Sequence, residues 1–431
     1  MIKVGLVSLG CAKNRVDSEM ILGMFPQEYF SFTIDPKDAD YIIINTCGFI
    51  EDAKKESIDT IFEMLSYKAK VIIVGCLAER YIEALEEEIP EASLIVPIKD
   101  YDKLAEKLAE LTGIKEIRPI NPLRRVIGGT PFSTYLRISE GCNNFCSFCA
   151  IPFIRGRFVS RPFVEILTEA RQLKEKGIKE ISLISQDTTI YGSDFPNQRP
   201  NIVDLLSELE KVGFYSIRLL YLYPGEISDD LIDKIAESKI IAHYFDIPVQ
   251  CASDKLLKLM KRHVTQKETM ELFRKIKIKC PDAILRTTLI SGFSGETIDD
   301  QRKTISFLKD VKFDHMGCFT YSPEEGTAGY YLPHRVRQST RERRKEELLN
   351  VQKGISYSNN KSHIGEIMEG IVIGGNNGSY QLRSYWNAPD DIDGHIYFKS
   401  KKELKSGDIV KVKITNAFIY DLDGELVEYI S

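Results

Sequence analysis

The chain has 431 residues, of which 43% are hydrophobic and 28% are charged. This length predicts two to four domains, and the composition is typical of soluble globular proteins. No apolar run reaches the roughly 18 residues of a membrane span and no signal segment is recognisable, so we expect a cytoplasmic protein without a membrane partner. In that reducing compartment, nine cysteines favour metal ligation or redox chemistry over structural disulfides. The net charge of -5 excludes a general electrostatic case for nucleic acid binding.

The first third of the chain contains three short apolar runs, each rich in β-branched residues and followed by polar, helix-forming sequence. They are "VGLVSLGC", "YIIINTC" and "VIIVGC", and each ends on a cysteine: Cys11, Cys47 and Cys76. The pattern predicts buried parallel strands of a wound α/β domain over residues 1–120. Because ligands gather at the carboxyl ends of such strands, three cysteines there favour a shared metal site over buried core thiols.

The middle of the chain returns to strand-helix alternation after "NPLRRVIGGTP", a stretch with two prolines and a Gly-Gly pair that is typical of a linker. Six strand-like segments, such as "EISLISQDTTIYG" and "AILRTTLISGF", predict a partial (βα)6 barrel over residues 128–355. Its active site is expected at the carboxyl ends of the strands. Beyond a charged helix, five short alternating segments predict a small β-barrel over residues 363–431.

The loop "GCNNFCSFC" follows the first predicted barrel strand and contains Cys142, Cys146 and Cys149. A structural zinc site needs four protein ligands, and no CxxC pair or nearby histidine completes one here. A [4Fe-4S] cluster fits better, because three thiolates leave one iron free to bind an exogenous group. Zinc and uncoordinated core cysteines remain the less favoured interpretations.

A CxxxCxxC loop after the first strand of a βα barrel resembles the radical S-adenosylmethionine enzymes. The resemblance implies that S-adenosylmethionine is the missing fourth ligand, and that Phe148 lies near its adenine. It also implies that Gln186 and Asp187 lie near the amino end of S-adenosylmethionine, and that Gly292 and Glu296 belong to an adenine-contacting turn. Alternatively, Gln186 and Asp187 are ordinary loop residues whose hydrogen bonds are satisfied within the protein, and Glu296 is an acidic residue favoured at the start of the following helix.

The resemblance extends over nearly the whole chain to one group of these enzymes, the methylthiotransferases. In that group the N-terminal cysteines hold a second [4Fe-4S] cluster that takes part in sulfur delivery, and the tail is a TRAM barrel. The reaction replaces C-H by C-SCH3, and the radical comes from the cofactor, so no catalytic side chain is expected. The implied partners are a reductant such as flavodoxin or ferredoxin and a sulfur donor.

Two branches of that group differ in substrate. "SLGCAKNRVDSE" and "LISQDTTIYG" resemble the branch that modifies an aspartate of ribosomal small-subunit protein twelve; the alternative is an adenosine next to the transfer RNA anticodon. Residues 363–431 contain eleven acidic and seven basic residues, which favours a basic protein partner over RNA. A third, non-catalytic alternative is a redox-sensing or RNA-binding module with an iron-sulfur cluster.

The remaining cysteines, Cys251, Cys280 and Cys318, fit no ligand spacing, and we interpret them as structural. Arg155, Arg157 and Arg161 follow the cluster loop. They are expected either to bind carboxylates of co-substrate or target or to lie on the surface.

Overall fold

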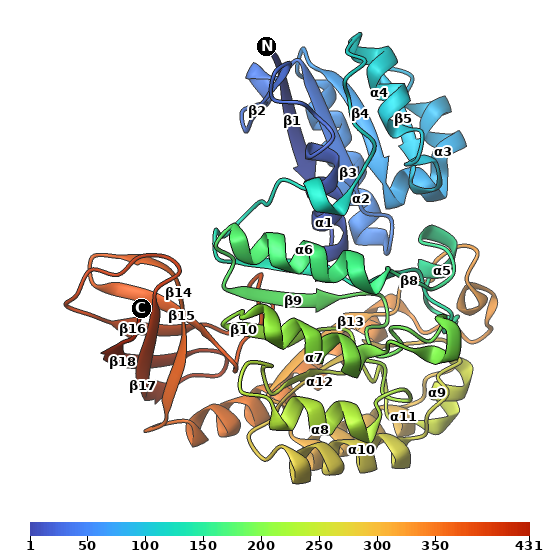
Figure 1. Cartoon of the computed structure of the whole chain (residues 1–431). Coiled ribbons are helices and arrows are strands. Elements are labelled where there is room, and N and C mark those ends of the chain that lie inside the picture. The colour runs from blue at the N-terminus through green and yellow to red at the C-terminus, as the bar shows by residue number, and fades with distance from the viewer.

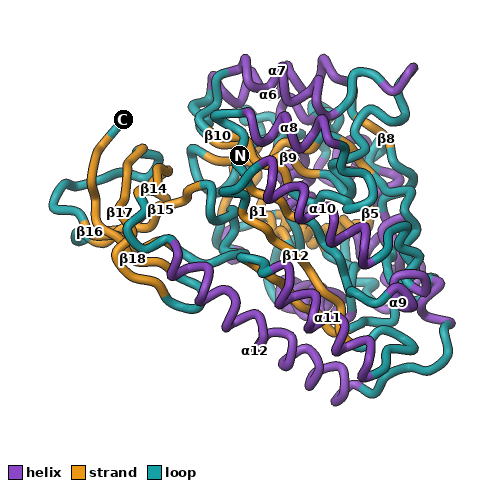
Figure 2. The backbone as a smooth tube through the Cα atoms, turned by 90° about the horizontal axis from the view of Figure 1, so that it is seen from below, coloured by secondary structure: helices purple, strands orange, loops and turns teal.

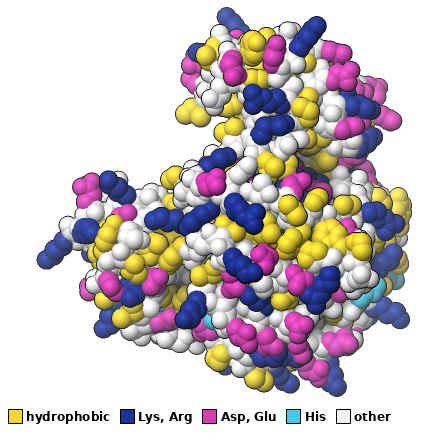
Figure 3. Space-filling model, viewed as in Figure 1, with side chains coloured by type: hydrophobic (Ala, Val, Ile, Leu, Met, Phe, Trp, Pro, Cys, Tyr) yellow, Lys and Arg dark blue, Asp and Glu magenta, His cyan; other side chains and the backbone are white.

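The computed structural model describes all residues, 1–431, and divides into three parts (Figure 1). An N-terminal α/β lobe stands above a central βα barrel, and a small C-terminal β-barrel lies beside the central barrel. Figure 3 shows the N-terminal lobe separated from the body by a narrow neck, with charged side chains of both signs over the visible face.

The N-terminal lobe is one five-stranded parallel sheet in the order β2-β1-β3-β4-β5. Its strands are β1 (Ile2–Ser8), β2 (Phe30–Thr33), β3 (Tyr41–Thr46), β4 (Lys70–Gly75) and β5 (Leu94–Pro97). Its helices are α1 (Ala12–Leu22), α2 (Glu51–Leu65), α3 (Cys76–Glu88) and α4 (Leu104–Thr112). The two central strands, β3 and β4, are buried almost throughout, because helices cover both faces of the sheet.

The central barrel has six parallel strands in two sheets, β10-β9-β6 and β11-β12-β13, with a bridge from Ile217 to Ile241 between them. The strands are β6 (Ser133–Arg137), β9 (Glu180–Ile184), β10 (Ser216–Leu219), β11 (Tyr244–Asp246), β12 (Ile284–Ser291) and β13 (His315–Thr320). The helices are α5 (Ile151–Ile154), α6 (Phe163–Glu175), α7 (Ile202–Val212), α8 (Asp229–Glu237), α9 (Asp254–Leu259), α10 (Gln266–Lys279) and α11 (Ile298–Val311). A short ribbon, β7 (Ser139–Glu140) with β8 (Val159–Ser160), closes the cluster loop at its base.

One long helix, α12 (Gln338–Ser362), runs along the edge of the barrel and leads into the C-terminal part (Figure 2). That part is a closed barrel in the order β14-β15-β16-β18-β17. Its strands are β14 (Ile367–Asn376), β15 (Ser379–Ser384), β16 (Ile396–Lys399), β17 (Ile409–Ala417) and β18 (Leu422–Tyr429). Trp386, which is fully buried, packs in the same core as Phe398 and Leu422.

The fold class predicted from the sequence is confirmed: a wound α/β lobe, a partial (βα)6 barrel and a small β-barrel. The edge strands β2 and β5 were not anticipated, because they are only four residues long and carry a weak apolar pattern. Helix α12 extends eight residues beyond the predicted charged segment, to Ser362. No helix has both the length and the apolar character that crossing a membrane requires.

Candidate metal and cofactor sites

The first cysteine trio lies where β1, β3 and β4 end, at the edge of the sheet that faces the barrel (Figure 1). Cys11 is the N-cap of α1, Cys47 directly follows β3, and Cys76 begins α3. The neighbouring backbone is tight: a Cβ on Gly10, whose φ is +87°, would lie 2.9 Å from the Cys47 sulfur. The parallel topology therefore brings three thiols from distant positions to the same edge of the sheet.

These thiols fit a metal cluster better than they fit an apolar core. Burial, together with the charges of the nearby Cys76 and Cys11 thiolates, raises the pKa of Cys47 to about 12. Burial also raises the pKa of Cys76. Grouped, desolvated thiolates are unfavourable without a cation among them, and iron would supply that charge. All nine cysteines of the chain are free thiols, so no disulfide competes for this trio.

The second trio lies in the loop after β6 and β7, at the carboxyl end of the barrel strands. Burial raises the pKa of Cys142 to about 11 and that of Cys149 to about 12, and the charge of Cys146 raises both. The Asn144 N-H points at the Cys142 sulfur from 3.5 Å, and Arg262 Nη1 lies 3.8 Å from the Cys146 sulfur. The loop thus places three thiols together beside a cation, which suits a cluster with one open iron.

Gln186 and Asp187 follow β9 and form hydrogen bonds with residues in and just before the loop that carries the second trio. Asp187 is 1% exposed and accepts a hydrogen bond from Asn144 Nδ2 at 2.8 Å. Gln186 donates to Glu140, while its own Oε1 is buried without a partner. That unpaired oxygen is one acceptor that a bound co-substrate could satisfy.

Gly292 and Glu296 form a turn after β12. Gly292 has a φ of +75°, and a Cβ there would lie 2.2 Å from Arg341 of α12. The Glu296 carboxylate accepts a hydrogen bond from the Gly292 N-H and forms an ion pair with Arg344 at 3.2 Å. Phe148 is half-buried against the apolar cluster of Cys251, Phe293 and Tyr321. Helix α12 therefore fixes the turn, and glycine is required at its tightest point.

Arg155 connects the loop of the second trio to the N-terminal lobe. Neither of the two roles that the sequence suggested for this residue includes such a contact. It is 8% exposed and its Nη1 lies 2.6 Å from Asp17 Oδ2 on α1. Its Nη2 donates to Asn14 Oδ1 at 2.6 Å and to the Cys76 sulfur at 3.4 Å. The expectation of a ligand-binding or surface arginine is therefore wrong: a side chain from the second cluster loop contacts a ligand of the first trio.

The other two arginines after the loop are also used by the fold. Arg161 pairs with Glu169 at 2.8 Å, and Arg157 stacks on Phe145 with its guanidinium carbon 4.3 Å from the ring centroid. Arg161 is therefore paired within the fold, whereas Arg157 is exposed and forms no ion pair, in line with the surface alternative.

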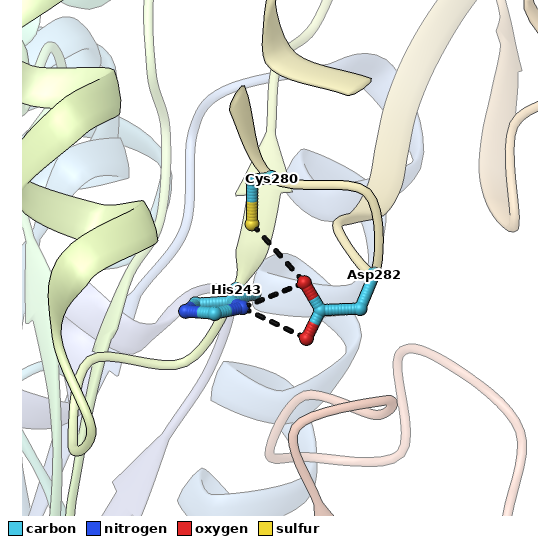
Figure 4. Close-up of side chains that lie close together, drawn as sticks. All are labelled: His243, Cys280 and Asp282. Atoms are coloured by element: carbon cyan, nitrogen blue, oxygen red, sulfur yellow. Dashed lines mark hydrogen bonds and ion pairs between the residues drawn. The ribbon is translucent and has the colours of Figure 1, made fainter. Parts of the chain in front are cut away.

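A third group of potential metal ligands lies at the opposite, amino end of the barrel (Figure 4). His243 Nδ1 is 2.9 Å from both oxygens of Asp282, and the Cys280 thiol donates to Asp282 at 3.4 Å. Burial raises the pKa of Cys280 to about 12, so the thiol stays protonated. Asp282 is already paired and its side chain is 61% exposed, so we assign no metal here.

Cys251, 5% exposed, and Cys318, 6% exposed, lie in apolar clusters, as their structural interpretation requires.

Helix α1 is the element whose importance sequence reasoning missed. It buries the polar Lys13, Asn14, Asp17 and Glu19 alongside the apolar Val16, Met20 and Ile21. Asp17 pairs with Arg137 at 2.5 Å, and Glu19 pairs with Arg125 of the predicted linker at 2.6 Å. A helix whose polar and apolar residues are mixed around its axis, directly after a strand of the sheet, is the signal that could have indicated a domain interface.

Comparison with known proteins adds three family matches along the chain. Residues 3–97 match an uncharacterized protein family designated UPF0004, residues 136–308 match the radical SAM superfamily, and residues 364–427 match the TRAM domain. The solved radical S-adenosylmethionine methyltransferase TsrM from Kitasatospora setae, with cobalamin and a [4Fe-4S] cluster bound, covers 88% of this chain and 77% of its own. The TM-score is 0.55 at 12% identity, which concerns the fold alone.

Sequence relatives are closer than any of these structures. A Clostridium kluyveri protein named ribosomal protein uS12 methylthiotransferase RimO is 45% identical, over 98% of this chain and 98% of its own length. Its namesake from Aquifex aeolicus is 44% identical over 99% of this chain and 98% of its own. With both cysteine trios in place and relatives of this identity along its entire length, the chain belongs to the RimO family of radical S-adenosylmethionine methylthiotransferases.

Proposed function

We propose that the chain methylthiolates ribosomal protein uS12, replacing a C-H bond at the β-carbon of an aspartate by C-SCH3. The observation that carries this proposal is the presence of two separate cysteine trios, linked by Arg155, which follows the second trio and contacts Cys76 of the first. An unactivated C-H bond offers no acid-base route, and two clusters allow radical formation and sulfur supply to occur side by side.

The cofactors are two [4Fe-4S] clusters and S-adenosylmethionine, which when bound supply the hydrogen-abstracting radical, the methyl group and the site of sulfur transfer. We assign Cys11, Cys47 and Cys76 to the auxiliary cluster, and Cys142, Cys146 and Cys149 to the radical cluster. Phe148, Gln186, Asp187, Gly292 and Glu296 form the walls of the S-adenosylmethionine pocket. No side chain is assigned a catalytic proton transfer.

Each of the three domains has a separate role in this proposal. Residues 1–120 hold the auxiliary cluster, residues 128–355 generate the radical, and residues 363–431 contact the substrate. The acidic balance of the C-terminal part favours a basic protein such as a ribosomal protein over RNA. A reductant such as flavodoxin or ferredoxin and a separate sulfur donor complete the system, which we place in the cytoplasm.

The test compares two substrates with one enzyme preparation. Anaerobically reconstituted protein is reduced with S-adenosylmethionine and offered either uS12 or transfer RNA, and mass spectrometry detects the methylthio group. We expect modification of uS12 alone at a single aspartate. Modification of transfer RNA alone would replace the proposal by the adenosine reaction, and no 5'-deoxyadenosine with either substrate would favour a non-catalytic module.

A further inference from the structure

The surface between α9 and α10 is basic, although the chain as a whole is acidic. Residues 254–275 contain seven basic and three acidic residues, against a net charge of -5 for the whole chain. An open cavity of about 500 Å³ lies on this surface. The titratable residues that line it are Asp254, Lys258, Lys261, Arg262, His263 and Glu268. A hollow rich in cations on an acidic molecule indicates a site for an anionic partner.

The acidic residues of this cavity are used by the fold, whereas two of its lysines are free. Asp254 accepts the first backbone N-H of α10 at 2.6 Å, and Glu268 belongs to the capping box of the same helix. Lys258 and Lys261 are exposed and form no ion pair, unlike the neighbouring lysines at positions 255 and 267. Two ammonium groups therefore remain for the carboxylates of a partner.

The basic cavity is in direct contact with the loop that carries the second cysteine trio. Arg262 lines the cavity, is 8% exposed, and places its Nη1 3.8 Å from the Cys146 sulfur. From the loop, the Ser147 N-H donates to the Met260 carbonyl at 2.9 Å, and the Ser147 hydroxyl donates to the Leu259 carbonyl at 2.7 Å. A single residue, Arg262, thus separates the cavity from a ligand of the radical cluster.

We propose that this cavity is the docking site for the protein that reduces the radical cluster, an acidic one-electron carrier. The inference rests on the proposed function and names the partner of its radical site. In this step the carrier loses one electron and the cluster held by Cys142, Cys146 and Cys149 gains it, while no bond forms or breaks. Because electron tunnelling weakens steeply with distance, the donor must dock where little protein separates the surface from the cluster.

Charge selects this partner. An acidic carrier is steered toward the exposed ammonium groups of Lys258 and Lys261, and such steering weakens as salt rises. Leu259, next to Lys258, is 36% exposed and supplies an apolar contact within the charged surface. RNA is the other anionic macromolecule, but its affinity grows with the number of phosphates that cations contact. Two free lysines supply few such contacts, so the position beside Cys146 favours the electron carrier.

The experiment compares two kinds of reductant on matched variants. The test variant combines Lys258→Glu with Lys261→Glu. The control combines Lys176→Glu with Lys239→Glu, which reverses two exposed lysines at the amino end of the barrel strands, opposite the cluster loop. Each reconstituted enzyme receives S-adenosylmethionine with either dithionite or a reduced carrier, flavodoxin or ferredoxin. The yield of 5'-deoxyadenosine is measured at several salt concentrations, and binding of the oxidised carriers and of a short single-stranded RNA is measured separately.

We expect the test variant to lower carrier affinity and carrier-driven 5'-deoxyadenosine formation at least about tenfold at low salt, because two attractive contacts become repulsive. Rising salt should narrow this difference. Iron content and dithionite-driven formation should match wild type, because the ligands of the cluster are untouched. The control variant should match wild type with every reductant.

Three results would overturn the inference. The first is an unchanged carrier-driven rate in the test variant. The second is an equal loss with dithionite, which would mean that the substitutions damage the cluster loop. The third is a loss of RNA binding in the test variant with unchanged carrier affinity, which would assign the surface to RNA. Failure of the proposed function is separate: it is shown by wild type that cleaves S-adenosylmethionine but modifies transfer RNA and not uS12.

Discussion

The two cysteine trios are brought together by opposite routes. Cys142, Cys146 and Cys149 lie within eight residues of one loop, so local backbone conformation brings them together. Cys11, Cys47 and Cys76 are spread over 66 residues and meet only because three parallel strands end at one edge. One site therefore depends on a loop, whereas the other depends on the folding of a whole lobe.

The difference has a functional consequence. A loop-borne trio can be tuned by the residues that follow it, and Arg155 is such a residue, because it reaches from that loop to Cys76. A strand-borne trio is rigid but fails when the sheet or its docking is disturbed. The two clusters should accordingly respond differently to local and to long-range changes.

The largest effect is expected from removing one ligand of each trio. Cys146→Ser should lower 5'-deoxyadenosine formation at least about 1,000-fold, because the thiolate ligand of the radical cluster is lost. Cys47→Ser should instead abolish methylthiolation while S-adenosylmethionine cleavage stays measurable. Iron analysis should show about four atoms in each variant against about eight in the parent.

These two variants separate the clusters only if each trio is independent. Loss of all iron in Cys146→Ser would contradict the comparison, since the strand-borne trio requires no residue of the loop as a ligand. Zinc in either purified variant or in the parent would contradict both assignments.

The next effect concerns the docking of the lobe. Burial raises the pKa of Asp17, but the charges of Arg155 and Arg137 outweigh burial and hold this pKa below its ordinary value. Asp17→Asn should therefore destabilise the lobe-barrel contact by about 3 kcal/mol, as for a broken buried ion pair. Thermal unfolding and limited proteolysis of the segment around residue 121 measure this loss.

The same pair predicts a pH dependence with a defined sign. Because the folded pKa of Asp17 lies below the unfolded value, its stabilisation is complete above about pH 4 and is lost as the pH falls through the folded pKa. Wild type should lose lobe docking in acid more steeply than Asp17→Asn. Equal slopes would show that other carboxylates govern the interface.

The difference between the loop trio and the strand trio also explains how far each site could be predicted from the sequence. The loop trio was predictable, because a CxxxCxxC spacing carries its geometry within a few residues. The strand trio was predictable because one local rule places Cys11, Cys47 and Cys76 alike. The contacts of Arg155 were not predictable, because the direction of a side chain at a domain seam depends on how separate parts dock. The Cys280 contact with His243 was missed for the same reason.

A smaller effect is expected from a single added methyl group. Gly10→Ala places a Cβ 2.9 Å from the Cys47 sulfur at a φ of +87°, so strain and overpacking should cost about 2–3 kcal/mol. Iron content should fall toward about four atoms, with the radical cluster retained. Gly156→Ala is the matched control: its φ is +75°, but no atom lies within 4 Å of the new Cβ, so about 1 kcal/mol of backbone strain is expected.

The smallest effect tests how much the loop site depends on packing beside its thiols. Phe148 precedes Cys149 and packs against Phe293 and Tyr321, so Phe148→Leu removes aromatic contact while the ligands stay in place. We expect a loss of about 1 kcal/mol in S-adenosylmethionine binding, seen as a several-fold higher KM with unchanged iron. Phe153→Leu, at a position that is 57% exposed on α5, should leave that KM unchanged. Equal shifts in both variants would mean that general loosening of the loop, rather than contact with the co-substrate, raises the KM.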